Sequence, residues 1–333
     1  MSAIDAFVVA RDHAPTLAAV IAALAAQTSR PGRVVLVDNA SSDGSVETVM
    51  GAAGDLNLEV VRNRHNRGFA AAANEALRRT TAPWVLALNP DCRLAPDYLE
   101  RLGGAVSTLQ RVGAATGLLL RAARPDLATT DIVDSAGIAV TASGRHVDRG
   151  SGGRLRAELS APAWVFGASG AAALYRREAL ADVAYDSGEV FDEGFFAYRE
   201  DADLAWRLQR RSWRCLYWPA ARAAHARGLR PEARRRGTAE INRHSVRNRF
   251  LWRLGNADWR WYLACFPWWL VRDAAVVGAC LTVERSSLPG LVEAWRLRAR
   301  QRERGRTNAV RALVSGWTLA RWFLPGGHAQ RLA

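Results

Sequence analysis

The 333-residue sequence contains no lysine, so all 46 of its basic side chains are arginine. Chemistry that needs a lysine amine is therefore excluded, which removes P-loop ATPases, protein kinases, pyridoxal-phosphate enzymes and Schiff-base aldolases. Cysteine is also scarce, with four residues far apart in the chain and no CxxC pair. This spacing argues against a zinc site or a disulfide framework, and we expect the cysteines to be reduced.

Long hydrophobic runs are missing as well. The two apolar stretches of the C-terminal part, residues 261–271 and 274–283, have 11 and 10 residues, whereas a spanning helix needs about 20. Joining them would bury Arg272 and Asp273 in the bilayer, at a cost of roughly 2.5–3.5 kcal/mol each. The N-terminus lacks the basic and apolar regions of a signal peptide. We therefore expect a cytoplasmic protein, peripheral on the inner face of the cytoplasmic membrane.

Charge and tryptophan are unevenly distributed along the chain. Residues 1–205 carry 20 arginines and 25 acidic side chains, a net charge of −5, whereas residues 206–333 carry 26 and 7, a net charge of +19. Eleven of the 13 tryptophans lie in the second segment. Arginine and tryptophan together are typical of helices lying on an anionic membrane surface, which is the partner that we predict. A soluble helical cap or a dimer interface is the alternative interpretation.

The first 120 residues alternate between strand and helix patterns, which indicates an α/β fold with a mostly parallel sheet. We expect strands over 4–10, 33–38, 58–61 and 84–88, and helices over 14–27 and 69–79. Residues 121–160 have no clear period and are expected to form loops or a flap. Further on, the patterns predict strand–turn–strand over 163–175, a helix over 200–211, a strand over 213–218, and basic helices beyond 222.

Polar side chains follow the predicted strands, where parallel sheets bind ligands. A carboxylate at Asp38 can accept a hydrogen bond from a nucleotide base or ribose, and a turn that caps the following helix is the alternative interpretation. Gly68 permits close backbone approach, but the small residues after it are also a common packing device. Asp91, in the sequence Asn89-Pro90-Asp91, can hold a divalent metal, and a type I turn is the alternative.

The segment FDEGFFAYREDAD (191–203) combines carboxylates with aromatic residues. Glu200 and Asp201 fall in the first turn of the predicted helix, where the helix dipole favours the ionised form that a general base needs. Simple helix electrostatics explains the acids, but it does not explain the aromatic run ahead of them. His225 follows a predicted strand and is either structural or a ligand of a metal or phosphate.

In this order, the motifs resemble those of the family 2 glycosyltransferases, and among them the bacterial rhamnosyltransferase-like branch. The matching segments are VVLVDNASSDGS (34–45), NRGFAAAAN (66–74), LALNPD (86–91), VFGASGAAALYRREAL (165–180), FDEGFFAYREDADLAWRL (191–208) and the segment from Pro219 to His225. The resemblance covers roughly residues 4–228. It implies a nucleotide-binding GT-A fold, so we divide the chain into a catalytic domain (1–228) and a basic, Trp/Arg-rich helical region (229–333).

The resemblance implies inverting transfer of a sugar, with rhamnose as a candidate, from a nucleotide-diphosphate sugar to a glycan or polyprenyl-linked acceptor in cell-envelope polysaccharide synthesis. It makes Asp201 the catalytic base, with Glu200 as the neighbour that tunes it. It assigns Mg²⁺ or Mn²⁺ as the cofactor, with Asp91 and His225 as the metal site. The nucleotide-sugar contacts would be Asp38, Asn66, Arg67, Gly68, Asn74 and Asn89. Without lysine, the diphosphate charge falls to the metal and to arginine, with Arg67, Arg199 and Arg227 as candidates.

Two departures from the family pattern stand out. Asn89 occupies a position where the family often has a second carboxylate, and the first strand ends in Ala10-Arg11-Asp12 instead of Thr-Tyr-Asn. Because of Asn89, a non-catalytic relative of the glycosyltransferases is an alternative interpretation. A nucleic-acid-binding protein using the basic region is a further alternative, but it leaves the acidic segment unexplained, so no nucleic acid is expected. A sugar-phosphate nucleotidyltransferase would carry a lysine and a glycine-rich loop after the first strand, and no glycine precedes Gly32.

Overall fold

The computed structural model of the protein describes residues 2–227, 239–327 and 329–332. Its centre is an eleven-stranded sheet in the order β13-β10-β12-β6-β11-β4-β1-β2-β3, with β5 beside β12 and β7 beside β6. The strands of this sheet are β1 (Ile4–Ala10), β2 (Val34–Asp38), β3 (Leu58–Arg62), β4 (Trp84–Leu88), β5 (Cys92–Leu94), β6 (Val112–Ala122), β7 (Thr129–Ser135), β10 (Ala163–Val165), β11 (Ala172–Arg176), β12 (Arg214–His225) and β13 (Gln330–Arg331).

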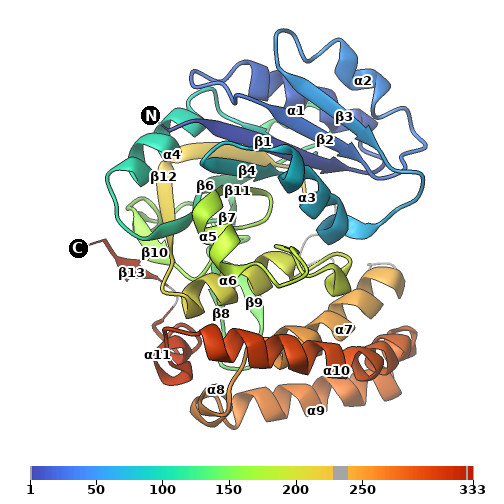
Figure 1. The fold of residues 1–333 in the computed structure, drawn as a ribbon, viewed down its shortest axis with the longest axis vertical. Helices are drawn as coiled ribbons and strands as arrows, with labels where there is room; N and C mark the ends of the chain where they lie inside the picture. The colour runs from blue at the N-terminus through green and yellow to red at the C-terminus, as the bar shows by residue number, and fades with distance from the viewer. Residues whose placement is uncertain (1, 228–238, 328, 333) are drawn as a thin grey trace.

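Helices surround the sheet, and the C-terminal ones form a separate layer at the end of the molecule away from β3 (Figure 1). The α-helices are α1 (Ala14–Ala25), α2 (Glu47–Met50), α3 (Gly68–Arg79), α4 (Tyr98–Ser107), α5 (Arg177–Val183), α6 (Glu200–Arg210), α7 (Ala239–Leu254), α8 (Trp259–Ala264), α9 (Trp268–Leu281), α10 (Leu288–Arg311) and α11 (Gly316–Ala320). Short 3₁₀ turns occur at η1 (Ala157–Leu159), η2 (Glu193–Phe195) and η4 (Arg285–Ser287).

The N-terminal half of the sheet is parallel, as the strand–helix alternation predicts. β1 pairs in parallel with β2 and β4, and Ala10 lies opposite Asp38. Every residue of β1, β2 and β4 is buried, which is why these strands are apolar without alternation. The strands therefore end at one edge, where the polar loops gather. Beyond β4, β11 runs antiparallel, so the sheet as a whole is mixed.

The expectation that residues 121–160 form loops or a flap is wrong for much of this segment. β7 pairs antiparallel with β6, and β8 (Ile138–Val140) forms a separate hairpin with β9 (His146–Asp148). β8 and β9 have three residues each, which is too short for a period to be recognised in the sequence. These elements bring Asp134, which is fully buried, beneath the edge of the sheet where the strands end.

β12 is longer than predicted, and its extension corrects the expectation of helix beyond residue 222. The strand continues to His225, with a register shift between Trp218 and Arg222 against β6. Pro219, which has no backbone N–H to donate to a ladder, lies within that irregularity. Past it, β12 pairs with β5, and His225 lies opposite Cys92. The extension therefore carries His225 next to the Asp91 loop.

A cluster of aromatic side chains joins α6 to the C-terminal helices. Trp206 of α6 is fully buried, and its ring centroid lies 4.9 Å from that of Trp252, 5.5 Å from that of Trp261 and 4.8 Å from that of Phe323. Such edge-on and tilted contacts add to the burial of apolar area. The helical region therefore shares a hydrophobic core with the first part of the chain, while the predicted boundary at 228–229 lies outside the described residues.

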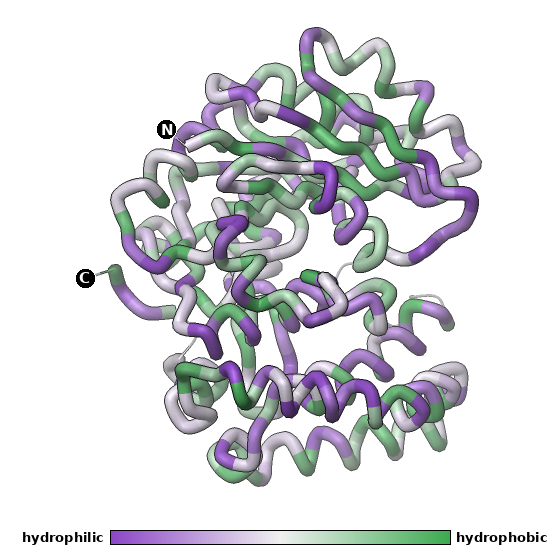
Figure 2. Tube along the Cα trace, in the orientation of Figure 1, coloured by the Kyte–Doolittle hydropathy of each residue, from purple (hydrophilic) through white to green (hydrophobic). Residues whose placement is uncertain are grey.

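The predicted basic helices are present. The longest, α10, extends from Leu288 to Arg311, and the short α11 follows it. No single helix in the described ranges is long and apolar enough to cross a membrane, and a pair that would be long enough together, residues 268–281 with 285–311, is bent by 106°. Figure 2 shows hydrophobic residues both along the central strands and along α9 at the outer face.

The aromatic cluster yields a test of this shared core. Trp252→Ala is expected to lower the free energy of unfolding by about 3–5 kcal/mol, because it removes a fully buried ring and leaves a cavity. Trp295→Ala, at a position that is 65% exposed, is the matched control and should cost less than about 1 kcal/mol. Chemical denaturation followed by circular dichroism measures both. Equal effects of the two substitutions would contradict a core shared between α6 and α7.

Candidate functional site

A cleft of about 1430 Å³ lies at the edge where β1 and β4 end, and its far wall is formed by α7 and α9. Seven of the ten residues predicted as site residues line it: Asn66, Gly68, Asn89, Asp91, Glu200, Asp201 and His225. These come from four loops and helix starts that are far apart in the sequence. The carboxyl ends of the strands and the start of α6 bring them together.

Asp38, Arg67 and Asn74 are not among the residues that line the cleft. Asp38 is buried and accepts a hydrogen bond from the Ser41 N–H, and its neighbour Asn39 faces the cleft instead. The guanidinium of Arg67 binds Glu75 at 2.9 Å. The predicted nucleotide contacts of these three side chains find no support in this geometry.

Asn74 has a structural function that its sequence motif did not reveal. Its amide donates to the carbonyl of Phe191 at 2.8 Å, and its side-chain oxygen accepts from the N–H groups of Val190 and Phe191. It therefore ties α3 to the segment that precedes α6. Gly68 contributes to the same junction, since a Cβ there would lie 2.6 Å from atoms of Phe196, and its φ of +80° is one that glycine adopts readily.

Asp91, His225 and Asp134 form a buried chain of polar contacts. His225 Nδ1 lies 2.7 Å from a carboxylate oxygen of Asp134, and its Nε2 lies 3.3 Å from Oδ1 of Asp91. Burial opposes protonation of His225, but the hydrogen bonds to the two carboxylates outweigh it and raise its pKa to about 9. Burial would raise the pKa of Asp91, yet His225 and Arg124 together hold it below its usual value.

The same chain has the chemistry of a metal site. A metal-binding histidine commonly donates one ring N–H to a carboxylate while its other nitrogen binds the ion, and Asp134 stands in that supporting position for His225. Nε2 of His225 and the carboxylate of Asp91 then fit a divalent cation as N and O donors. Within the described residues, no group of three or more His, Cys, Asp or Glu side chains is arranged to hold a metal. Among the described residues, Nε2 of His225 and the Asp91 carboxylate are therefore the two donors of this candidate site, and further positions would belong to ligand oxygens.

Glu200 and Asp201 begin α6 at the cleft wall, directly after a turn of unusual backbone conformation. Tyr198 and Arg199 both have positive φ, 71° and 74°, which L-residues rarely adopt. Asn248 of α7 holds this turn from behind, because its fully buried amide lies within 3.0 Å of the carbonyls of Phe195, Ala197 and Tyr198. The helical region thus supports the backbone that presents the two acids.

The two acids have different surroundings. Asp201 accepts hydrogen bonds from the N–H groups of Gly170, at 3.1 Å, and Ala202. Glu200 Oε2 is buried and has no hydrogen-bond partner among the described residues. Burial raises the pKa of both groups, and for Glu200 burial and the charge of Asp201 raise it to about 8. At neutral pH, Glu200 therefore holds a proton, while the two backbone N–H groups favour the ionised form of Asp201 against its burial.

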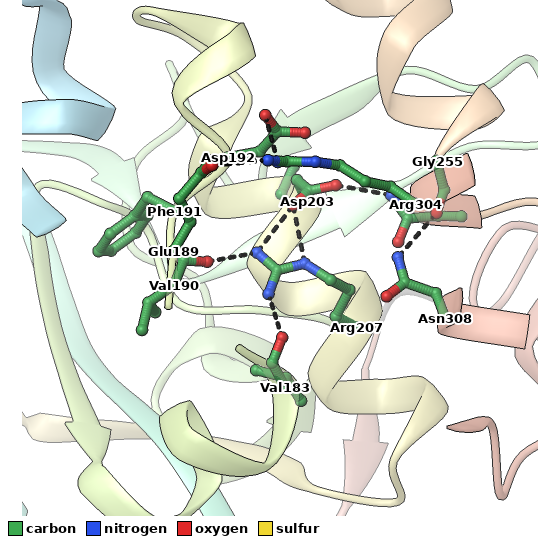
Figure 3. A network of polar contacts seen from close by, with 12 residues as sticks. Val183, Glu189, Val190, Phe191, Asp192, Asp203, Arg207, Gly255, Arg304 and Asn308 are labelled. Carbon is green, nitrogen blue, oxygen red and sulfur yellow. Dashed lines mark hydrogen bonds and ion pairs between the residues drawn. The ribbon is translucent and has the colours of Figure 1, made fainter. Parts of the chain in front are cut away.

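Behind this pair lies a network of buried charges that anchors α6 and the segment before it (Figure 3). Arg207 binds the carboxylate of Asp203 and donates to the carbonyls of Val183, at 2.7 Å, and Val190, at 2.6 Å. Arg304 of α10 reaches Asp192 at 2.6 Å and Glu189 at 2.8 Å. Buried charges that are paired in this way specify one arrangement, because removing a partner leaves an uncompensated charge.

Several residues of the site were missed by the sequence analysis. Asp134 and Asp148 both bind Arg227, at 3.1 and 2.7 Å, and Arg124 binds Asp91. Arg227, a candidate for the diphosphate, lines the cleft, as does Arg199. In the sequence, Asp134 directly follows the apolar residues Ile132 and Val133. This apolar setting was the one signal that could have indicated a buried acid. Asn248 carried no recognisable signal.

Comparison with known proteins identifies the fold and the family. The sequence model described as "Glycosyl transferase family 2" matches residues 5–184. An N-acetylglucosaminyl-diphospho-decaprenol L-rhamnosyltransferase of Mycobacterium tuberculosis is 28% identical over 236 residues, which are 63% of this chain and 72% of the relative.

Two solved structures are similar to this one over most of the chain. A mannosyltransferase of Pyrobaculum calidifontis, in complex with GDP-Man and Mn²⁺, has a TM-score of 0.53 at 20% identity, over 96% of this chain and 85% of the other. Residues 1–349 of TarS from S. aureus have a TM-score of 0.55 at 17% identity, over 92% and 88% of the two chains. These similarities support the GT-A fold.

The raised pKa of Glu200 predicts a pH-dependent stability. Between pH 4.5, the ordinary pKa of a glutamate, and about 8, the folded protein holds a proton that the unfolded chain has released, so stability falls as pH rises through this window. Glu200→Gln removes this titration and should gain stability over wild type above pH 8. Because one pKa unit is worth about 1.4 kcal/mol, the gain should be a few kcal/mol at most.

Denaturation at pH 5 and pH 9 measures this effect. Glu178→Gln, at an acid whose side chain is 71% exposed, is the matched control and should show no such pH dependence. A difference between Glu200→Gln and wild type that stays constant from pH 5 to pH 9 would mean that Glu200 ionises normally.

Proposed function

Because the chain belongs to glycosyl transferase family 2 and is a glycosyltransferase, we propose that it transfers a sugar from a nucleotide-diphosphate sugar to a hydroxyl of a lipid-linked glycan, with inversion. The observation that carries this proposal is one cleft that holds both the Asp201 carboxyl group, bound by two backbone N–H groups at the start of α6, and the Asp91–His225 pair. The name of the Mycobacterium tuberculosis relative supports a polyprenyl-diphosphate acceptor in cell-envelope synthesis and makes rhamnose the first sugar to test.

In the proposed reaction Asp201 is the general base. The acceptor oxygen forms a bond to the anomeric carbon, the bond from that carbon to the diphosphate breaks, and the hydroxyl proton passes to the Asp201 carboxylate. The hydrogen bonds from Gly170 and Ala202 hold that carboxylate in place. Glu200 keeps its own proton near neutral pH, so it adds no second negative charge beside the base.

Asp91 and His225 would hold a divalent cation, Mg²⁺ or Mn²⁺, which would supply positive charge to the leaving diphosphate. Asp134 orients His225 for this contact through Nδ1. The mannosyltransferase structure with GDP-Man and Mn²⁺ supports a metal in this fold. Asn66 and Asn89, on the same cleft wall, are proposed to contact the nucleotide sugar.

Two substitutions test the proposed catalytic base, Asp201, and the proposed metal ligand, Asp91, separately. Asp201→Asn should lower kcat about 10²–10⁴-fold while donor binding is retained, because only proton removal is lost. Asp91→Ala should abolish the dependence of donor binding on Mg²⁺ or Mn²⁺. Release of nucleotide diphosphate measures turnover, and thermal shift against a panel of nucleotide sugars measures binding. Asp186→Asn, at an acid whose side chain is 77% exposed, is the control. Normal turnover of Asp201→Asn would remove Asp201 as the base.

We also propose that the protein docks on the anionic inner face of the cytoplasmic membrane. Large apolar side chains are exposed on α8, α9 and the turn between them: Trp259, Leu263, Phe266, Trp268, Leu270 and Val271. We call these six residues the apolar face. It belongs to the segment with a net charge of +19, which complements an anionic surface.

Flotation with vesicles tests the docking. Wild type should float with phosphatidylglycerol-containing vesicles, and Val271→Glu should lose most of this binding because it adds a negative charge to the apolar face. Val310→Glu, at an 87% exposed position on α10 outside that face, is the control. Unchanged flotation of Val271→Glu would contradict the proposal. So would a wild-type protein that does not bind vesicles but forms a dimer or an RNA complex that Val271→Glu disrupts.

A further inference from the structure

The cleft wall formed by α7 and α9 carries excess positive charge. Arg249 and Arg272 line the cleft, and Arg253 lies one helical turn beyond Arg249. The carboxylate of Asp273 accepts a hydrogen bond from Arg249 Nε at 3.0 Å and also binds Arg253. Glu240, the other acid on this wall, contacts His244 at 3.7 Å. Two guanidinium groups therefore share the Asp273 carboxylate, and the third, that of Arg272, is not paired with it.

This charge is only partly compensated. Arg249 Nη2 donates to the Ser143 carbonyl at 2.8 Å, and the guanidinium of Arg253 lies over the rings of Phe250 and Trp269. Arg249 is buried, and burial together with the neighbouring charges of Arg253 and Arg272 lowers its pKa to about 10, in spite of Asp273. Nε and Nη1 of Arg253 are buried without hydrogen-bond partners among the described residues. Arg272 is exposed and forms no ion pair within the part of the chain that the structure describes. Unpaired charge at low dielectric is unfavourable, so an anion on this wall would be stabilising.

The position of Arg272 on α9 connects this wall to the apolar face. Trp268, Arg272 and Val276 follow one another at intervals of four residues, so they lie along one side of the helix. Arg272 and Val276 line the cleft, whereas Trp268 is 49% exposed in the apolar face. A ligand with an anionic group at Arg272 can therefore extend a hydrocarbon chain along α9 towards Trp268 and Val271.

We propose that Arg249 and Arg272 form a binding site for the phosphate groups of the acceptor, a prenyl diphosphate glycolipid whose hydrocarbon chain lies on the apolar face. The inference rests on the proposed function, because it locates the acceptor of that reaction. It is separate from the donor diphosphate, which is assigned to Asp91 and His225 on the sheet side of the cleft. Arginine suits this site because its planar guanidinium binds phosphate oxygens in pairs.

Farnesyl diphosphate is the probe, used with the full chain in solution without vesicles. Calorimetric titration should show binding at least about tenfold tighter than that of farnesol, which has the same chain and no charge. Arg272→Gln should lose about tenfold or more in affinity for farnesyl diphosphate and little for farnesol, because a charged hydrogen bond is lost. Arg249→Gln should show the same loss of affinity for farnesyl diphosphate. If the Arg249→Gln variant fails to fold, the Arg272→Gln variant still tests the proposal, because Arg272 is exposed.

Control variants identify where the diphosphate binds. Arg296→Gln, at an exposed arginine of α10 outside the cleft, should bind as wild type does. Asp91→Ala should also bind farnesyl diphosphate normally, and loss of binding in Asp91→Ala instead of Arg272→Gln would assign the probe to the donor site and overturn the proposal. So would equal affinity for farnesol and farnesyl diphosphate.

A vesicle arm separates an acceptor phosphate from a lipid headgroup. If Arg272→Gln loses flotation with phosphatidylglycerol vesicles but keeps its affinity for farnesyl diphosphate, Arg272 binds headgroups and the proposal is overturned. Failure of the glycosyltransferase proposal would give a different result. There would be no turnover with any nucleotide sugar, but farnesyl diphosphate would still bind, and Arg272→Gln would still weaken that binding.

Discussion

The buried ion pair between Asp203 and Arg207 anchors the start of α6, and the site depends on that position. Arg207 joins Asp203 to the carbonyls of Val183 and Val190, so one guanidinium connects α6, the end of α5 and the segment before η2. The other oxygen of Asp203 accepts from Asn256 at 2.7 Å. With both oxygens engaged, α6 has one stable placement, and Glu200 and Asp201 in its first turn reach the cleft as a consequence.

The basic helical region is part of this anchoring, although its composition suggested an appendage. Asn248 holds the carbonyls of the strained turn before Glu200, and Arg304 binds the acids Glu189 and Asp192. Trp206 and Trp252 join the two parts through a common core. Arg304 is therefore buried against acids of the first part, whereas Arg249 and Arg253 pair with Asp273 within the helical region itself.

The titrating groups of the cleft divide in a similar way between its two sides. On the sheet side, Asp134 and Asp91 keep His225 charged in the absence of a metal, because their hydrogen bonds outweigh its burial. At α6, burial instead keeps Glu200 protonated at neutral pH, while backbone N–H groups favour the ionised form of Asp201 against its burial. Different surroundings of this kind are the means by which one site can hold both an acid and a base.

The sequence by itself determined the alternation of strands and helices, the loops at the strand ends and the acidic start of α6, because these depend on local periodicity and helix electrostatics. The motif order was enough to indicate the family. Only the tertiary structure decided the pairing of His225 with Asp134, 91 residues apart, which needed both an unpredicted β7 and a longer β12. It also turned Asn74 and Arg67 away from the cleft and brought Asn248 behind the acid turn. The physical reason is that buried polar groups must find partners, and those partners lie in parts of the chain that no local pattern relates.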